Sequence, residues 1–505
     1  MNTTTVAADA AEAPLILTID IGSSSARALL YDRHGRMVEG IGAQVRYEIL
    51  TKAAGAAEVD PDWIVEQTAR GVDSVLVKAG KLAQQIAAVA IDTLVTSIVA
   101  VDAAGQALTP LITYADTRNA EDAAALRARL DEATIHDRTG CLLRTSYWPA
   151  RLAWFRRTQP GLWRRAAKWL TLGEYLELRL FGRCRVSYSA ASWSGLLDRR
   201  QLVWDAPLLA ELGLTPEQLS PLVDCDAPLT GLIQPYAGRW PLLHDVPWFP
   251  AIGDGAAANV GSGCIDHRRM ALTLGTTGAI RVIQTELTPT PPGLWSYRVD
   301  RNHHLVGGAT SEGGNVYAWM RDAFQFGDRA QTEAALAALE PDSHGLTILP
   351  FFAGERSPDW AGNVQATIHG LTLATTPLQI LRASLEAVAY RFAVIEQRLC
   401  GRPVCDHRLI ASGGALLQSP VWSQIFADVL GRPVVVSAES EATSRGTALL
   451  ALRALGMLPS LAAAPAADGA VYLPDPAHHE RYQAAIARQR ALYEQVILHR
   501  NGAEL

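Results

Sequence analysis

The sequence predicts an α/β protein made of two related domains. Its 505 residues are enough for two to four domains of ordinary size. A short apolar strand, a loop rich in Gly, Ser and Thr, and a second strand occur in order near residue 15 and again near residue 270. These two copies lie about 250 residues apart, half the chain, and a repeat at that spacing indicates two related domains.

Each copy has the same three parts. In the first, residues 15–20 form an apolar run typical of a buried strand, and 26–31 form a second strand that ends at a turn over 32–35. In the second, 270–274 and 279–283 are the strands. Because each loop leads from strand to strand, neither copy is a strand–loop–helix motif.

Helix signals fill the sequence around these copies. Asp60 can cap a helix whose first turn accommodates Pro61. Further helices are predicted over 117–130, 375–399, 419–430, 441–455 and 476–499. The Trp- and Arg-rich stretches 149–155 and 163–169 could bind nucleic acid. We favour helix faces whose Trp side chains belong to the core.

The predicted domain organisation follows from composition. Residues 1–13 are predicted to be a disordered tail, 14–258 the first domain and 259–456 the second. Residues 457–505 are predicted to be a Pro/Ala linker and a C-terminal helix. The boundary is placed where glycines cluster, at Gly253, Gly255, Gly261 and Gly263.

Charge and hydropathy exclude several classes of protein. The 45 Lys and Arg and 51 Asp and Glu give a net charge of −6, which excludes a generally basic nucleic-acid binder. No apolar run is long enough to span a membrane, and the first residues lack the features of a secretory signal. The six scattered cysteines form no zinc pattern, so we expect reduced thiols in a cytoplasmic protein.

The two polar loops indicate phosphate binding. Successive backbone N–H groups and hydroxyls at close range can hold phosphate without a lysine, and two such loops could hold two ends of a triphosphate. Asp20, at the end of the first strand, could hold Mg²⁺ through water. No P-loop or dinucleotide-binding motif is present. The loop residues are Gly22, Ser23, Ser24 and Ser25, and Gly275, Thr276 and Thr277.

Two further features point to a ligand. Asp254 follows an apolar run and stands between glycines that let a ligand approach the backbone, so it could accept a hydroxyl proton. The strand at 409–412 runs into Gly413 and Gly414 ahead of a helix, where a flat ring could lie against the backbone.

In order, the motifs resemble those of the FGGY carbohydrate kinases, which include xylulose, gluconate, glycerol and ribulose kinases. The resemblance covers roughly residues 15–455. It is carried by DIGSSS at 20–25, YADTR at 114–118, GDG at 253–255, LGTTG at 274–278, AGERSP at 353–358, SGGA at 412–415 and SRGTA at 444–448.

The resemblance implies two actin-like (ribonuclease-H-like) domains with an interdomain cleft, and transfer of the ATP γ-phosphate to a sugar hydroxyl with Mg²⁺. Asp254 is then the catalytic base and Asp20 the metal-side carboxylate. Besides the two loops, the nucleotide would be bordered by Gly314, Gly414, Ala415 and Gln418. The sugar side would hold Val95, Thr96, Tyr114, Asp116 and Arg118. We expect ATP and a sugar or sugar acid as partners, and a homodimer as the assembly.

The motifs also predict which sugar the protein would phosphorylate. LGTTGAIR, GGATSEGGNVYAWMRD and AGERSPDW look most like gluconate kinases, so D-gluconate is predicted first and D-xylulose second. Val95 and Thr96 depart from the Met-His of both families, and Tyr114 stands where Trp is usual. The alternatives of another class are an actin-like ATPase and a sugar sensor without catalysis.

Overall fold

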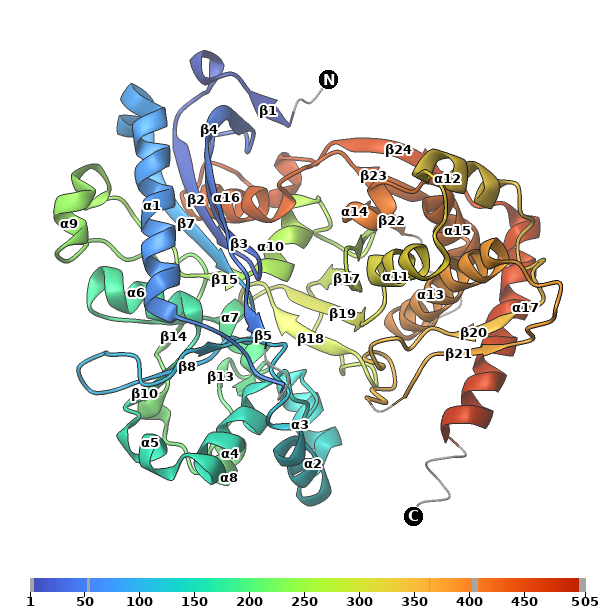
Figure 1. Ribbon diagram of the computed structural model, residues 1–505. Helices are drawn as coiled ribbons and strands as arrows, with labels where there is room; N and C mark the ends of the chain where they lie inside the picture. Colours follow the sequence, from blue (N-terminus) through green and yellow to red (C-terminus); the bar gives the residue numbers. More distant parts are fainter. Residues whose placement is uncertain (1–3, 52–54, 363, 402–406, 499–505) are drawn as a thin grey trace.

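The computed structural model describes residues 4–51, 55–362, 364–401 and 407–498. Figure 1 shows two halves, each built around its own sheet. The sheet of the first half has six strands in the order β1-β4-β3-β2-β7-β15. Their bounds are Thr5–Val6, Met37–Arg46, Ser25–Tyr31, Leu15–Ile21, Ile86–Thr93 and Ile252–Gly253.

The sheet of the second half has seven strands in the order β18-β19-β17-β16-β22-β23-β24. Each sheet contains an antiparallel hairpin, β2–β3 or β16–β17, whose first strand pairs in parallel with β7 or β22. The predicted repeat is therefore present in the fold. The bounds are Trp295–Arg298, His304–Thr310, Gly278–Gln284, Arg269–Leu274, Arg408–Ser412, Val434–Ser437 and Asp468–Tyr472.

Helices cover both faces of the first sheet. Alternate residues of β2 point to opposite faces, so Leu15 and Leu17 pack toward α1 (Pro61–Ala79), while Ile16 packs toward α16 (Ala442–Ala454). As predicted, Asp60 caps α1 by accepting from the backbone N–H groups of Asp62 and Trp63.

The core of the second half lies between its sheet and a group of helices. The helices predicted over 375–399 and 419–430 are present as α13 and α15. Thr376 forms a capping box with Gln379 at the start of α13, and Ser419 caps α15. These helices are α11 (Gly314–Phe324), α12 (Arg329–Ala337), α13 (Pro377–Cys400), α14 (Gly414–Leu417), α15 (Pro420–Leu430) and α17 (Pro476–Tyr493). β20 (Thr347–Leu349) and β21 (Thr367–His369) form a separate hairpin.

A largely helical insertion lies between β7 and β15. The Trp-rich stretches belong to its core: Trp148 and Trp169 are fully buried. The helix expected over 163–169 is only partly correct, because α5 ends at Arg165 and β10 follows. The helices are α2 (Ala120–Arg129), α3 (Glu132–Thr139), α4 (Trp148–Thr158), α5 (Pro160–Arg165), α6 (Leu172–Phe181), α7 (Tyr188–Ser194), α8 (Ala206–Leu212) and α9 (Tyr236–Arg239).

Short strands accompany the insertion. They form a three-stranded sheet, β5-β6-β9, and three two-stranded pairs, β8 with β10, β11 with β14, and β12 with β13. Their bounds are Leu50–Thr51, Ala57–Val59, Leu111–Ile112, Val99–Val101, Lys168–Leu170, Val186–Ser187, Leu222–Val223, Leu197–Asp198 and Val203–Trp204.

Three sequence predictions need correction. Residues 4–13 are not a disordered tail, because β1 pairs in parallel with β4 and Val6 joins the core of the first half. The predicted linker after residue 456 contains β24, which extends the second sheet. Cys141, Cys184, Cys225 and Cys264 are buried free thiols, but Cys400 is disulfide-bonded; Cys405 lies outside the described residues.

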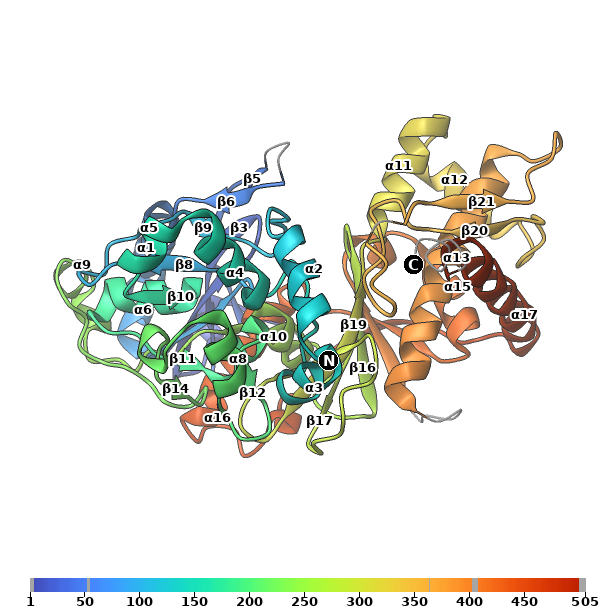
Figure 2. The same cartoon turned by 90° about the horizontal axis from the view of Figure 1, so that it is seen from below.

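The two halves meet at a pair of crossing helices, α10 (Asp254–Gly261) and α16. Although α16 follows β23 of the second sheet in the chain, Figures 1 and 2 place this red helix beside the strands of the first half. Glycines allow the close crossing. A Cβ on Gly446 would lie 1.9 Å from the carbonyl oxygen of Ala257, and one on Gly261 would lie 1.7 Å from that of Ala442.

None of the helices in the described ranges is both long and apolar enough to cross a membrane.

Candidate active site

Three aspartates meet at one edge of the first sheet. Asp20 and Asp92 are register partners in the parallel strands β2 and β7, and Asp254 directly follows β15, which pairs with β7. Carboxyl ends of neighbouring parallel strands lie side by side at a sheet edge, and ligands bind there in open α/β sheets. The topology therefore brings together three carboxylates from distant parts of the chain.

Burial dominates the electrostatics of these carboxylates. It raises the pKa of Asp20, with Arg27 acting in the opposite direction, and it raises the pKa of Asp92 well above its ordinary value, helped by the charge of Asp20. Burial and the charge of Asp20 raise the pKa of Asp254 to about 6, against the opposing effect of Arg281. A cation or a proton must therefore compensate this cluster.

Side chains of α16 hold two of the carboxylates. Thr447 Oγ1 donates to Asp92 Oδ2 at 2.7 Å, and Ser444 Oγ donates to Asp20 Oδ2 at 3.4 Å. Gly446, which stands between Ser444 and Thr447 in the chain, lies at the helix crossing. These contacts explain the residue types in the SRGTA sequence. Its hydroxyls support the carboxylates, and its glycine admits α10.

The two predicted phosphate loops are compact turns between antiparallel strands. Gly22 N donates to the carbonyl oxygen of Ser25 at 3.0 Å, and Gly275 N donates to that of Thr277 at 3.0 Å. The start of α11 braces the second loop, since Gly314 N donates to the carbonyl oxygen of Gly275 at 2.7 Å. Ser23 and Thr277 line the same cavity, so the loops face each other.

A cavity of about 820 Å³ lies wholly within the second half, and we call it the second-half cavity. Its lining includes every residue predicted to border the nucleotide, together with part of the second loop. Gly413 beside it has φ +89°, and a Cβ there would lie 2.5 Å from the carbonyl oxygen of Leu274. The predicted residues that line this cavity are Gly275, Thr276, Gly314, Gly414, Ala415 and Gln418.

A second cavity, of about 250 Å³, lies where the halves meet, and we call it the central cavity. Asp254 lines it together with Ser23 and Thr277. The predicted sugar-side residues Val95, Thr96 and Tyr114 line it as well. Thr96 has φ +58°, an uncommon conformation for a β-branched residue, and a buried arginine, Arg151, donates to its carbonyl oxygen.

Sequence reasoning missed the aromatic and basic lining of the central cavity. Trp193 stacks on Tyr297 with ring centroids 3.6 Å apart, and the hydroxyls of Tyr147 and Tyr297 are 2.5 Å apart. Arg281 and Arg356 line the same cavity. Asp92 was also missed, although the run 86–91 that precedes it is an apolar strand ending at an aspartate, as 15–19 is before Asp20.

Asp116 and Arg118 are not among the residues that line the central cavity. Arg118 Nη2 lies 2.6 Å from Asp116 Oδ2 and 3.0 Å from Glu58 Oε2. The backbone N–H of Ala57 also donates to Asp116, and the Arg118 guanidinium lies 4.8 Å from the ring centroid of Trp154. The pair braces the segment next to Tyr114, and its predicted role in substrate binding stays a prediction.

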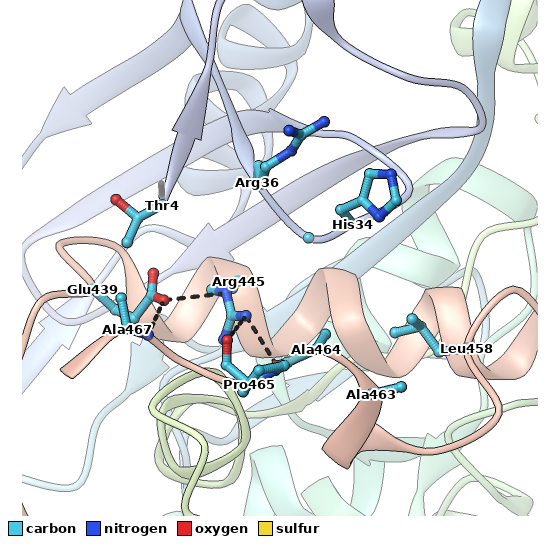
Figure 3. Close-up of a pocket in the computed structure, with 11 residues that line it drawn as sticks. Thr4, His34, Arg36, Glu439, Arg445, Leu458, Ala463, Ala464, Pro465 and Ala467 are labelled. Atoms are coloured by element: carbon cyan, nitrogen blue, oxygen red, sulfur yellow. Dashed lines mark hydrogen bonds and ion pairs between the residues drawn. The ribbon is translucent and has the colours of Figure 1, made fainter. Parts of the chain in front are cut away.

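Figure 3 shows a third pocket beside α16. Its volume is about 290 Å³. Arg445 extends from the helix and donates to the carbonyl oxygens of Gly261, Ala464 and Pro465. Arg36 pairs with Asp32, and Arg445 lies 3.5 Å from Glu439. Both arginines are therefore engaged in contacts within the protein, and Arg445 joins α16 to the end of α10.

Two models of one protein family match most of this chain. A model described as the FGGY family of carbohydrate kinases, N-terminal domain, matches residues 15–261. The C-terminal domain model of the same family matches residues 270–455. The chain belongs to the FGGY family of carbohydrate kinases.

Several FGGY kinases resemble the chain over nearly its whole length. A gluconokinase from Bacillus subtilis is 29% identical over 478 residues, covering 90% of this chain and 91% of the relative. A glycerol kinase from Aromatoleum aromaticum is 32% identical over 467 residues, covering 88% and 90%. Crystal structures of a gluconate kinase and a ligand-bound xylulose kinase, both from Lactobacillus acidophilus, match with TM-scores of 0.89, 25% identity, and coverage of 95% and 98%.

These findings confirm the predicted fold class and enzyme class. This FGGY kinase has the two-domain α/β fold of the family, and it is a phosphotransferase that uses ATP and an alcohol group of a carbohydrate as acceptor. Of the residues predicted to bind the nucleotide, the second-half cavity is lined by Gly275, Thr276, Gly314, Gly414, Ala415 and Gln418. The central cavity is lined by Ser23 and Thr277 together with Asp254, Val95, Thr96 and Tyr114. Neither cavity has Gly22, Ser24, Ser25, Asp116 or Arg118 among its lining residues.

Proposed function

We propose that this kinase transfers the γ-phosphate of ATP to a hydroxyl of a sugar acid, D-gluconate first and D-xylulose as the alternative. One observation carries the proposal. Asp254 is the only carboxylate among the described residues that line the central cavity, and the two loops meet there through Ser23 and Thr277. A sugar hydroxyl in this cavity lies between a base and a phosphate site.

Asp254 has the properties of a general base. It begins α10, so its backbone is fixed, and Gly255 N donates to its Oδ1 at 2.7 Å. With a pKa of about 6, the carboxylate is mostly ionised at neutral pH and is more basic than an ordinary aspartate. It would take the proton of the attacking hydroxyl as the oxygen bonds to phosphorus and the bond to ADP breaks.

The carboxylates beside it fit Mg²⁺. Asp92 Oδ1 is buried and has no hydrogen-bond partner in the described part of the chain, and the contacts of Asp20 with Ser444 and Arg27 are long, 3.4 Å each. Carboxylate oxygens are preferred ligands of Mg²⁺, often through water. Asp20 and Asp92 would hold the ion, which would neutralise charge on the transferring phosphate.

The second-half cavity would take the nucleotide. Gly414 and Ala415 carry no bulky side chain at one part of its wall, and Tyr317 and Arg329 add a ring and a cation that lie 5.5 Å apart. Thr276 links this cavity to the second loop, so a nucleotide bound here would direct its phosphates toward Thr277 and the central cavity.

The choice of sugar rests on the relatives and on the sequence. Gluconokinases and a gluconate kinase structure are among the matches, which supports D-gluconate, and xylulose kinase structures support the alternative. The departures at Val95 and Thr96 fall in the central cavity, where they would contact the sugar. A cytoplasmic location and a homodimer remain predictions.

A substrate panel tests the proposal. ADP release is measured with D-gluconate, D-xylulose, glycerol, D-glucose and no sugar, each with ATP and Mg²⁺. We expect turnover to require sugar and to be highest with D-gluconate. ADP release that is independent of sugar would indicate an ATPase, and turnover only with glycerol or only with D-glucose would overturn the ranking.

A further inference from the structure

The side chains that line the central cavity carry more positive than negative charge. Two guanidinium groups, of Arg281 and Arg356, line it, and Asp254 is the only acidic side chain among the described lining residues. The other lining side chains are uncharged. Even with Asp254 ionised, the cavity carries one positive charge in excess.

Two glycines leave space for the side chain of Arg281. It lies on β17 opposite Gly307 of β19, and a Cβ on Gly307 would be 2.9 Å from its Cγ. A Cβ on Gly255 would be 3.0 Å from its Nη1. Larger residues at these glycines would displace the side chain, so both positions keep room for a guanidinium beside Asp254.

The hydrogen bonds of Arg281 are incomplete. Nη2 donates to Thr273 Oγ1 at 2.8 Å, while Nε is buried and has no partner among the described residues. Burial lowers its pKa, and the charge of Asp254 acts in the opposite direction. An under-satisfied buried cation of this kind gains free energy when an anion binds next to it.

Arg356 is less engaged still. Its guanidinium lies 5.9 Å from the ring centroid of Trp360, and the structure gives its side chain no hydrogen bond or ion pair within the described ranges. Its charge acts on the pKa of Tyr147 and Tyr297, whereas Arg281 acts on the pKa of Asp254. Both guanidinium groups line the same cavity, so both can act on an anion bound there.

We propose that Arg281 and Arg356 bind the carboxylate of an acidic sugar and make this kinase selective for sugar acids over neutral sugars. The inference rests on the proposed function in one respect, that the central cavity holds the acceptor. It adds the residues that would distinguish D-gluconate from D-xylulose. Arg356 offers free donors for a two-point contact, and Arg281 adds the second charge.

The test compares two acceptors that differ at one carbon. D-Gluconate carries a carboxylate where D-glucitol carries a CH₂OH group, and the rest of the chain is the same. For the wild type we expect kcat/KM to favour D-gluconate. In Arg356→Gln, the KM for D-gluconate should rise about 10- to 100-fold, the range for a lost charge-assisted hydrogen bond, with little change in the KM for D-glucitol. Arg281→Gln also changes the surroundings of Asp254, so its readout is the ratio of kcat/KM for D-gluconate to kcat/KM for D-glucitol, which should fall. The double variant should lose the preference.

Arg356→Lys and Arg281→Lys are the matched controls, because each keeps the positive charge and should keep part of the preference. Thermal unfolding of every variant checks that the fold is intact. A double variant with the wild-type preference would overturn the proposal, as would an equal loss on both acceptors.

Binding calorimetry separates this inference from the proposed function. D-Gluconate and D-glucitol are titrated into wild type and variants without ATP. Arginine-dependent binding of D-gluconate without turnover would support the carboxylate site and contradict the proposed reaction. Turnover of D-xylulose with no binding of D-gluconate would support a kinase and overturn the carboxylate site.

Discussion

Asp254 is the residue on which the proposed chemistry depends. Its replacement in Asp254→Asn keeps the size of the side chain and removes the base. We expect turnover to fall about 10²- to 10⁴-fold, the usual effect of losing a general base. Nucleotide affinity should be unchanged, because the second-half cavity does not include this residue. Single-turnover assays and ADP titration measure the two quantities, and near wild-type turnover would remove Asp254 from the role of base.

The raised pKa of Asp254 predicts an acid limit on activity. The base must be ionised to accept a proton, so kcat/KM for the sugar should fall as pH drops through about 6 and should level off above it. An aspartate with the ordinary pKa of 3.8 would keep activity to a much lower pH. The measurement is kcat/KM between about pH 4.5 and 8 at saturating ATP, and a profile that stays flat to the acid end of that range would contradict the raised pKa.

Several site residues were predictable because their signals are local. Asp20, Asp254 and the two loops each follow an apolar strand, and the chain within a few residues identifies them. Asp92 has the same local signal, an apolar run before an aspartate, but nothing local shows that Thr447, 355 residues away, supports it. Arg281 has no such signal, because it becomes a cavity residue only when β17 faces α10. Asp116 matched a motif, but nothing local revealed that it is engaged by Arg118 and Ala57.

At the scale of elements, the crossing of α10 and α16 depends on two glycines. Gly446→Ala would place a methyl group 1.9 Å from the Ala257 carbonyl oxygen, so the helices must separate. We expect a loss of stability of about 1–3 kcal/mol or more, as for other overpacked cores. Chemical denaturation measures it. Gly161→Ala is the control, since no atom lies within 4 Å of its added Cβ, and equal stability of the two variants would contradict the close crossing.

The elements that the sequence predicted well are those with local start signals. Helices α1, α13 and α15 begin where Asp60, Thr376 and Ser419 cap them. The elements it missed are short edge strands. β1, β10 and β24 contain two to five residues each and form because a distant strand offers unpaired backbone groups. Hydrophobic periodicity cannot reveal such strands, since the pairing partner decides them.

For the whole molecule, the positions of the two cavities predict a closing motion. The second-half cavity belongs to one half, while the central cavity takes Ser23 and Asp254 from one side and Thr277 and Arg356 from the other. Binding of both substrates should draw the halves together and exclude water from the reacting groups. Small-angle scattering of the free, singly liganded and doubly liganded protein should give the smallest radius of gyration with D-gluconate and an ATP analogue together.

Arg445 and the third pocket indicate where that motion pivots. Because Arg445 ties the end of α10 to residues 464–465, we expect these contacts to persist while the central cavity opens or closes. An unchanged radius of gyration in all four states, with both ligands shown to be bound, would contradict a closing motion.

The position of α16 also affects how the first half folds while the chain is being synthesised. The inner face of the first sheet, with Ile16, Ala88 and Ala90, is covered by a helix that emerges about 190 residues after Asp254. At about 5–20 residues per second, the nascent first half waits about 10 to 40 s with that apolar face uncovered. Its aggregation during synthesis should therefore depend on translation speed and on chaperones that shield apolar surface until residues 442–454 have been made.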